Sequence, residues 1–444
     1  MPQLNLDVDP LESLRGFLSF LDEQGEVLHI TRKVRQSFEL AAIVQNIQKT
    51  VNKAILFENV EGYRGRVASN LFGSHRNIAR MLSSAHESLS NTWVERCKGF
   101  RVFDYSRPSE HPVGLREIAL SELPSITFHE KDGGPYVTGG IVAAKHPETG
   151  TTNLSYHRVL MTGSDELVIR LVPSGHLFLN QKICEDRGKP LECAILIGNS
   201  PLLMLAGTAT LSRSESELDL ASHFLGKAWP LRRCKTVNLE VPVDTEIVLE
   251  GEILPDTKRM EGSFGEWMGY YTLPEPNHIF KVKGAFAKEN PIYYAVVTSS
   301  PEDIALLGIP TAGSILKAIQ TWVPGVQDVV CWPTLQFCVI KMRKQYDGEE
   351  HKALMAALGA DLSRILYAIV VDEDVDIYSP TDVLWAVSTR CRPDKDIFII
   401  PDVPSYPRDP AKRHWGRVGI DATVPMDLKK EFERKRIPTA EKIR

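Results

Sequence analysis

Short β-type runs separated by glycine, proline and asparagine fill the middle of this 444-residue chain, from about residue 112 to 300. They are rich in β-branched and aromatic residues, and clear examples are residues 140–144, 167–172, 236–241, 246–249 and 292–297. Closely spaced strands with few long helices between them are typical of barrels and sandwiches. The sequence therefore predicts a β-rich domain over residues 112–300, with a β-barrel or sandwich core.

Helical periodicity marks the segment that precedes this region. Apolar residues recur at helical spacing over residues 11–21 and 40–47, and short strand candidates lie at 26–30 and 54–57. We therefore expect residues 1–111 to form a mixed α/β segment.

A second mixture of helices and strands begins at about residue 301. Four leucines spaced by four residues predict a helix over residues 352–366, and a buried strand is expected directly after it, at 368–371. We expect residues 301–424 to form an α/β scaffold or oligomerisation domain, and the basic residues 425–444 to form a helix or a solvated tail. The predicted fold class is α+β.

Length, charge and cysteine usage limit the classes of protein. At about 150 residues per domain, 444 residues correspond to roughly three domains. The formal net charge of −5 argues against a nucleic-acid binder, and no apolar stretch is long enough to span a membrane. Seven scattered cysteines without a C-x-x-C pair indicate neither a zinc knuckle nor a disulfide framework. The first residues lack the pattern of a signal peptide, so we expect a cytoplasmic protein.

The familiar enzyme motifs are missing from the sequence. It contains no G-x-G-x-x-G, no G-x-x-x-x-G-K-[ST] and no H-E-x-x-H. Residues 261–266, Glu-Gly-Ser-Phe-Gly-Glu, are similar to a hydrolase nucleophile elbow but lack the G-x-S-x-G spacing. A nucleophilic Ser263 is therefore not expected.

Glu261 and Glu266 stand five residues apart in the most unusual segment of the chain, which is rich in aromatic residues: Phe264, Trp267, Tyr270 and Tyr271. Aromatic neighbours can desolvate a carboxyl, which raises its pKa and suits it to proton transfer near neutral pH. The alternative is a pair of exposed loop glutamates beside core aromatics.

A second polar segment contains Asn153 and Arg158. Arginine binds carboxylate or phosphate in a two-pronged fashion, although Arg158 could also be a structural surface residue. Further along, His176 follows a strand candidate, and Glu215 and Glu217 lie in a serine-rich stretch. Asn, His and Glu side chains can together bind a divalent cation, but this spacing is too wide to indicate a metal site by itself.

Taken in order, these segments resemble the UbiD family of prenylated-FMN-dependent decarboxylases over nearly the whole chain. The most specific block reads Glu-Gly-x-Phe-Gly-Glu-x2-Gly-Tyr-Tyr. The blocks together are residues 11–30, 54–60, 70–73, 153–158, 238–242, 246–251, 261–271, 382–386 and 419–423. Ser263 departs from the pattern because it stands where a proline is common, and His157 does so because it separates Tyr156 from the arginine. The resemblance implies an N-terminal α/β segment, a central split-barrel-like domain that binds the prenylated flavin and a C-terminal α/β oligomerisation domain.

The resemblance also implies roles for individual residues. Arg158, Glu261 and Glu266 match the catalytic arginine and two acids of the family. A divalent ion, Mn²⁺ or Mg²⁺, that anchors the cofactor phosphate, often with K⁺ nearby, would be held by Asn153, His176 and Glu217. Glu217 is preferred to Glu215 because Ser216-Glu217 aligns with a Ser-Glu pair of the family.

The cofactor-binding set that the resemblance implies is larger. Arg417 belongs to it because it stands where many relatives carry a lysine that contacts the cofactor. The full set is Asn153, Ser155, Tyr156, His157, Arg158, His176, Glu217 and Arg417.

The activity implied is reversible, non-oxidative decarboxylation of an aromatic or heteroaromatic acid of the furan, pyrrole or hydroxybenzoate type. A prenyl-flavin synthase would supply the cofactor, and a homodimer or homohexamer is expected. Three alternatives stay open: a ubiquinone-pathway polyprenyl-hydroxybenzoate decarboxylase, an α,β-unsaturated acid decarboxylase and a non-catalytic scaffold subunit of a carboxylase complex. The presence of Arg158, Glu261 and Glu266 together argues against the scaffold subunit.

Overall fold

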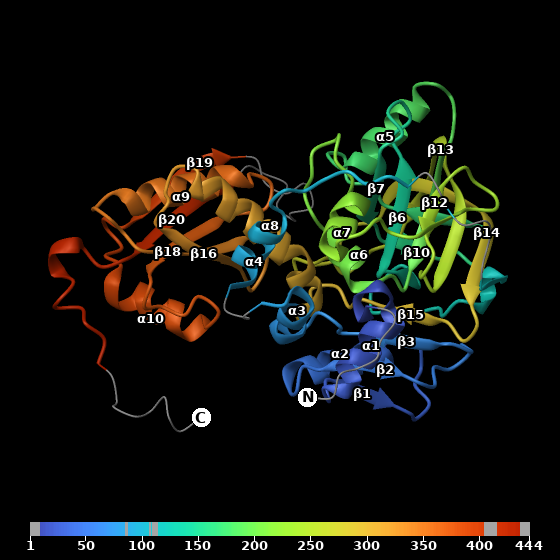
Figure 1. The fold of residues 1–444 in the computed structure, drawn as a ribbon, viewed down its shortest axis with the longest axis horizontal. Helices are drawn as coiled ribbons and strands as arrows, with labels where there is room; N and C mark the ends of the chain where they lie inside the picture. Colours follow the sequence, from blue (N-terminus) through green and yellow to red (C-terminus); the bar gives the residue numbers. More distant parts are fainter. Residues whose placement is uncertain (1–8, 85–87, 106–107, 109–113, 404–414, 436–444) are drawn as a thin grey trace. The chain divides into compact units, whose positions relative to one another are not determined.

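The computed structural model describes residues 9–84, 88–105, 108, 114–403 and 415–435. The chain divides into two compact units, residues 1–310 and 311–444, and each of them combines helices with β-sheet (Figure 1). The predicted α+β class is confirmed. In the described part of the chain, no helix combines the length and the hydropathy that crossing a bilayer requires.

A four-stranded sheet is built mainly from the N-terminal segment. Its strand order is β1 (Val27–Ile30), β2 (Ala54–Phe57), β3 (Arg66–Ser69) and β15 (Ile292–Tyr294). The run expected at 292–297 in the central core thus lies here, because β15 pairs in parallel with β3. The helices of this segment are η1 (Pro10–Glu12), α1 (Leu14–Glu23), α2 (Glu39–Lys49), α3 (His75–Leu82) and α4 (Leu89–Arg96).

A nine-stranded antiparallel sheet forms the centre of the first unit. Its path is β5 (Tyr136–Val137), β8 (Val159–Leu160), β9 (Glu166–Ile169), β14 (Glu275–Lys288), β13 (Ile247–Glu261), β10 (Leu191–Ile197), β6 (Gly140–Lys145) and β7 (Thr152–Tyr156), and β4 (Leu115–Glu117) pairs with β14. Among the described residues the end strands β5 and β7 do not pair with each other, so the sheet does not close. The same region contains η3 (Leu120–Glu122), α5 (His176–Glu185), α6 (Pro201–Ala206), α7 (Glu217–Leu225) and the small sheet of β11 (Leu231–Arg233) and β12 (Glu240–Pro242).

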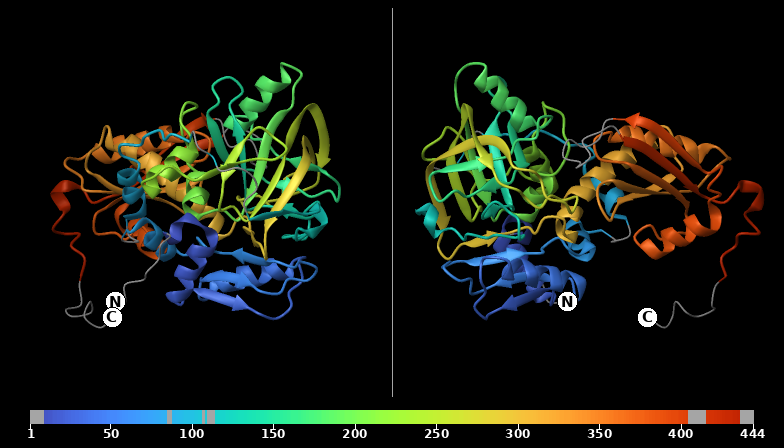
Figure 2. Two further views of the ribbon diagram at one scale, coloured as in Figure 1. Left: turned by 45° about the vertical axis from the view of Figure 1, so that its right-hand side comes forward. Right: turned by 180° about the vertical axis from the view of Figure 1, so that it is seen from behind.

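The central strands are apolar on both faces because they separate two hydrophobic cores. On β6, Ile141 and Ala143 face one core, whereas Val142 and Ala144 face the other. This alternation is the two-residue period of a strand. The first core also contains Phe17 of α1, so the N-terminal segment and the central sheet are packed into one unit, as both views of Figure 2 show.

An ion pair also joins α1 to the central sheet. Arg15 Nε and Nη2 donate to the two carboxylate oxygens of Glu246 at 2.9 and 2.8 Å, and Glu246 is fully buried. A buried carboxylate is stable only with such partners.

The second unit is built on a five-stranded mixed sheet. Its strand order is β16 (Val326–Cys331), β17 (Phe337–Met342), β18 (Tyr367–Asp372), β20 (Trp415–Ala422) and β19 (Ile397–Val403). Helices α9 (Glu349–Ala360) and α10 (Pro380–Arg390) pack against it, and α8 (Pro301–Gln320) crosses the division between the units.

Helix α9 ends earlier than the leucine pattern predicts. Asp361 follows its last residue and accepts hydrogen bonds from the backbone N–H groups of Ser363 and Arg364 at 3.1 Å. Such local bonds compete with the helical ones, so Leu362 lies outside the helix and is exposed.

The C-terminal segment was expected to form a helix or tail. Its described part contains the short 3-10 helix η4 (Met426–Leu428), and Arg434 then pairs with Asp382 of α10 at 2.7 Å. The last nine residues, 436–444, lie outside the described residues.

Candidate active site

Arg158 lies between β7 and β8 and is held by two carboxylates. Its Nε and Nη2 donate to Glu261 at 2.7 and 2.9 Å, and its Nη1 donates to Glu266 at 3.1 Å. Glu261 is the last residue of β13 and is fully buried. The structure therefore brings together the three residues that the sequence singles out as an acid–base group.

The surroundings of Arg158 stabilise its charged form. Burial opposes the charge, but the hydrogen bond to Glu261 and the charges of Glu261 and Glu266 outweigh it and raise the pKa of Arg158. The guanidinium also lies 4.7 Å from the ring centroid of Phe264, a cation–π contact. Of the aromatics in this segment, Phe264 and Trp267 are buried, whereas Tyr270 and Tyr271 are exposed.

The glycines of residues 261–271 are explained by close backbone contacts. A Cβ atom on Gly262 would lie 2.4 Å from Cα of Gly133, and one on Gly265 would lie 2.6 Å from Nδ1 of His129. Gly265 N–H also donates to Asp132 at 3.0 Å. The segment around residues 129–133 therefore supports the loop that carries Glu266.

A chain of hydrogen bonds runs along β7 beside Arg158. Burial lowers the pKa of His157 to about 4, so its ring is neutral at pH 7. Its Nδ1 lies 2.8 Å from the carbonyl oxygen of Arg170, which can only accept, so Nδ1 carries the proton and Nε2 is an acceptor. Ser155 Oγ lies 3.0 Å from that Nε2 and 3.1 Å from Oδ1 of Asn153. The hydroxyl of Ser155 has one proton, so it can donate to only one of these two acceptors. Oδ1 of Asn153 has two lone pairs, and at least one of them is left for another ligand.

Asn153 and Glu217 are in contact and both are buried. Asn153 Nδ2 donates to Glu217 at 3.2 Å, and the backbone N–H of Leu154 donates to the same carboxylate oxygen at 2.8 Å. Burial raises the pKa of Glu217 to about 7, and in the described part of the chain no cationic side chain pairs with it. Glu217 is thus a buried carboxylate that lacks a counter-ion.

His176 and Glu217 are the first residues of α5 and α7, and both helices contact β7, the strand of Asn153. His176 makes no hydrogen bond to Asn153 or Glu217, and burial, Arg213 and His146 lower its pKa. A neutral imidazole is the form that binds metals. Glu215, the alternative to Glu217, instead accepts hydrogen bonds from the backbone and hydroxyl of Ser212.

Tyr156 and Arg417, two further members of the predicted cofactor set, lie outside the hydrogen-bonded groups described above. The hydroxyl of Tyr156 is buried without a hydrogen-bond partner among the described residues. Arg417 lies on β20 in the second unit, where it is buried and donates to the carbonyl of Leu362 at 2.6 Å. Their roles stay predictions.

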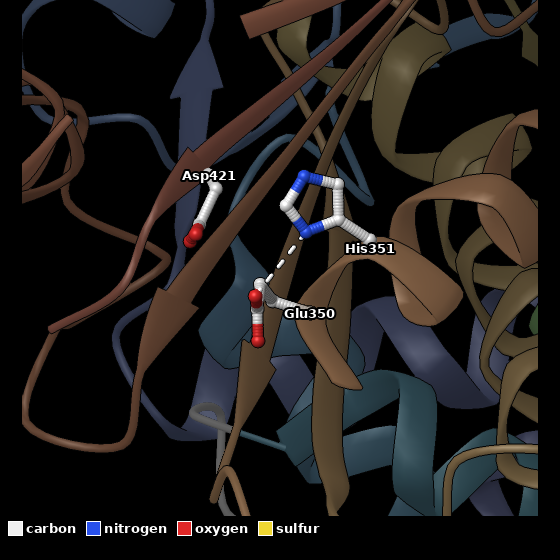
Figure 3. A group of neighbouring side chains, drawn as sticks. All are labelled: Glu350, His351 and Asp421. Carbon is white, nitrogen blue, oxygen red and sulfur yellow. Dashed lines mark hydrogen bonds and ion pairs between the residues drawn. The ribbon is translucent and has the colours of Figure 1, made fainter. Parts of the chain in front are cut away.

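A second group of potential metal ligands lies in the second unit. Glu350, His351 and Asp421 place one ligand atom each within 4.8 Å of one another (Figure 3). The ammonium of Lys344, which is buried, lies 3.7 Å from Glu350 and 3.0 Å from Thr423. A cation of the protein itself therefore already lies beside this group and offsets part of its negative charge.

Several residues that support the site carry no signal in the sequence. Asn277 donates to Glu261 from the neighbouring strand β14, and Thr298 donates to the carbonyl of Gly265 at 2.6 Å. Both reach the site from segments outside the motif, so only the three-dimensional structure relates them to it.

Gly262→Ala is expected to reduce the free energy of unfolding by about 1–3 kcal/mol, since the new methyl group must displace the backbone at Gly133. Urea denaturation measures the change. Gly359→Ala is the matched control, because a Cβ there meets nothing within 4 Å and alanine favours a helix by up to about 1 kcal/mol. A Gly262→Ala protein as stable as the parent would contradict the close contact.

His157→Gln is expected to remove part of the acid sensitivity of the fold. The pKa of His157 is about 4 in the folded protein and about 6.5 when unfolded, so the unfolded chain binds the proton first as the pH falls. The parent should lose about 2 kcal/mol of unfolding free energy between pH 7 and pH 5 through this residue, and the variant should not. The control is His29→Gln. Because the hydrogen bond to Glu58 raises the pKa of His29, this histidine stabilises the fold as the pH falls, so its removal should make the protein more sensitive to acid. Equal pH slopes for the parent and His157→Gln would refute the assignment.

Three matches to known domains cover most of the chain. Residues 18–97, 104–301 and 304–422 match, respectively, the N-terminal, Rift-related and C-terminal domains of 3-octaprenyl-4-hydroxybenzoate carboxy-lyase, the three domains of the UbiD family. The anhydromevalonate phosphate decarboxylase of Methanothermobacter thermautotrophicus is 32% identical over 431 residues, which are 94% of this chain and 98% of that protein.

Solved structures agree with these matches. The UbiD-class enzyme HmfF from Pelotomaculum thermopropionicum, in complex with FMN, superposes with a TM-score of 0.91 at 33% identity, covering 97% of this chain and 99% of HmfF. An evolved dimeric form of HmfF in complex with prFMN superposes with a TM-score of 0.88 at 32% identity, covering 98% of this chain and 99% of that one. The apo 3,4-dihydroxybenzoic acid decarboxylase of Enterobacter cloacae superposes with a TM-score of 0.89 at 25% identity, covering 98% of this chain and 100% of that one. The chain therefore belongs to the UbiD family and is a carboxy-lyase.

Proposed function

We propose that the protein catalyses the reversible, non-oxidative decarboxylation of an aromatic or heteroaromatic carboxylic acid with prenylated FMN. The observation that carries this proposal is Arg158, a buried arginine that is held by Glu261 and Glu266. An arginine with free N–H groups binds a carboxylate, and a neighbouring carboxyl can protonate the carbon that loses CO₂.

The donor set beside β7 fits a divalent cation. Asn153 has lone pairs available, Glu217 is buried without a counter-ion, and His176 is neutral. A carboxylate, an amide oxygen and an imidazole together suit Mn²⁺ or Mg²⁺. We assign these three residues to the metal that would anchor the cofactor phosphate, with K⁺ as a further ion.

Prenylated FMN, when bound, would supply an electron sink for the electron pair that remains when CO₂ leaves an sp² carbon. Bound prFMN in the HmfF structure supports this cofactor. The residues that would hold it in the first unit are Asn153, Ser155, Tyr156, His157, Arg158, His176 and Glu217.

The guanidinium of Arg158 would bind the substrate carboxylate. It has five N–H donors, and the contacts to Glu261 and Glu266 use Nε, Nη2 and Nη1 once each. One N–H therefore remains on each of Nη1 and Nη2, the pair that matches a carboxylate. Glu261, which also accepts from Asn277, orients this arginine.

Glu266 would donate the proton that replaces CO₂. Its side chain is 14% exposed whereas that of Glu261 is fully buried, so Glu266 is the carboxyl that can exchange protons during turnover. A general acid of this kind contributes about 10²–10⁴-fold to the rate.

The aromatic substrate class is supported by the 3,4-dihydroxybenzoic acid decarboxylase. The anhydromevalonate phosphate decarboxylase favours a second candidate, a phosphorylated acid of the α,β-unsaturated type. A panel of furoic, pyrrole-carboxylic, hydroxybenzoic and phosphorylated unsaturated acids, screened for CO₂ release with the prenyl-flavin-loaded enzyme, distinguishes the two. We also propose a homodimer or homohexamer that receives its cofactor from a prenyl-flavin synthase.

Glu266→Gln should abolish CO₂ release, because an amide cannot donate the proton, while the visible absorbance of the bound cofactor persists. Glu275→Gln is the matched control, since Glu275 lies on β14 and pairs with Arg170. Full activity of Glu266→Gln would sink the assignment of Glu266.

Glu217→Gln should weaken binding of the divalent ion at least tenfold, because the amide lacks the charge that compensates the cation. Elemental analysis of the purified protein and the amount of cofactor retained both report the loss. Glu215→Gln should leave both unchanged, and the reverse result for the two variants would move the metal ligand to Glu215.

A further inference from the structure

Asp303 lies in the first turn of α8, next to the loop that carries Glu266. Its carboxylate accepts the backbone N–H of Ser299 at 2.9 Å, and its own N–H donates to Ser300 Oγ at 3.3 Å. The side chain is half-buried.

The segment before α8 contacts the Glu266 loop on both sides of that glutamate. Thr298 donates to the carbonyl of Gly265 at 2.6 Å, and a Cβ atom on Gly269 would lie 3.7 Å from Ser299 Oγ. The start of α8 and the loop are thereby held against each other.

The charges around Asp303 favour its protonated form. Burial raises the pKa of Asp303 to about 7, and the negative charge of Glu266 acts in the same direction, against the N–H of Ser299. Among the described residues, no arginine, lysine or histidine forms an ion pair with Asp303, and no cation contributes to its pKa shift. Arg158 forms its ion pair with Glu266 instead.

The neighbouring carboxyl, Glu302, is engaged in other contacts. It is fully buried and accepts from Tyr294 at 2.9 Å and from the backbone N–H of Asn70 at 2.7 Å. Glu302 is therefore bound to the N-terminal segment, and Asp303 is the α8 carboxyl whose charge is coupled to that of Glu266.

We propose that Asp303 returns a proton to Glu266 after each turnover, and this inference rests on the proposed function of Glu266. In the forward reaction the C–C bond to CO₂ breaks, its electron pair stays on the substrate carbon, and that carbon takes the proton of Glu266. The O–H of Asp303 then gives its proton to the Glu266 carboxylate, directly or through one water, and Asp303 takes a proton from solvent. One proton is consumed per CO₂ released, so the step balances.

Asp303 does not touch the substrate in this scheme, because it acts only by supplying the proton that Glu266 passes on. Asp303 and Glu266 are both partly exposed, and the Glu266 carboxyl is also bound to Arg158. Delivery requires protonated Asp303, so kcat should fall as the pH rises through about 7.

The test is Asp303→Asn in the cofactor-loaded enzyme, because asparagine keeps an acceptor for Ser299 but has no acidic proton. We expect kcat to fall on the order of 10²-fold while KM stays nearly unchanged. The decline of kcat above pH 7 should disappear, and the solvent isotope effect on kcat should rise. Asp303→Glu should restore most of kcat and the decline above pH 7, and it keeps the test decisive if the asparagine variant folds poorly.

Glu302→Gln is the matched control. It removes the adjacent carboxyl of the same helical turn and should lower stability, but the shape of the kcat profile against pH should not change. An unchanged profile and isotope effect in Asp303→Asn would overturn the inference and leave Glu266 in its role. Activity in Glu266→Gln would instead overturn the proposed function, so the two failures are distinguishable.

Discussion

A buried arginine between two carboxylates is the constraint on which the site depends. Removing charged groups from water costs several kcal/mol for each ion, and only excellent geometry compensates for it. Glu261 supplies that geometry through a bidentate pair with Arg158 and a further bond from Asn277. Three strand spacings, about 14 Å in a flat sheet, separate β13 from β7. The central sheet must therefore curve to bring these charges together.

The loop after β13 is fixed from several directions at once. Asp132 binds the N–H of Gly265, Thr298 binds its carbonyl, and Gly262 lies directly against Gly133. Glu266 thus has a rigid backbone although it lies outside a strand, which is what the precise placement of a catalytic group requires.

The sequence predicts those parts of the site that are local in the chain. Asn153 and Arg158 share one segment, Glu261 and Glu266 share another, and both motifs are recognisable without a structure. Asn277 and Asp303 are not, because their contacts depend on sheet register and on the packing of α8. The same reason explains why the run at 292–297, predicted in the central core, lies instead in the N-terminal sheet: its partner strand β3 is more than 200 residues away in the sequence. Helix α9 ends early because of one aspartate, an effect that leucine spacing cannot reveal.

The late arrival of β15 has a consequence for biosynthesis. Strands β1 to β3 leave the ribosome first, but the open edge of β3 is covered only when Ile292–Tyr294 emerges. At about 5–20 residues per second, that interval lasts on the order of tens of seconds. During this time the nascent chain exposes an unpaired strand edge that can pair with other chains. The edge of β3 is therefore the part of the N-terminal sheet that is open to non-native pairing for the longest time during synthesis.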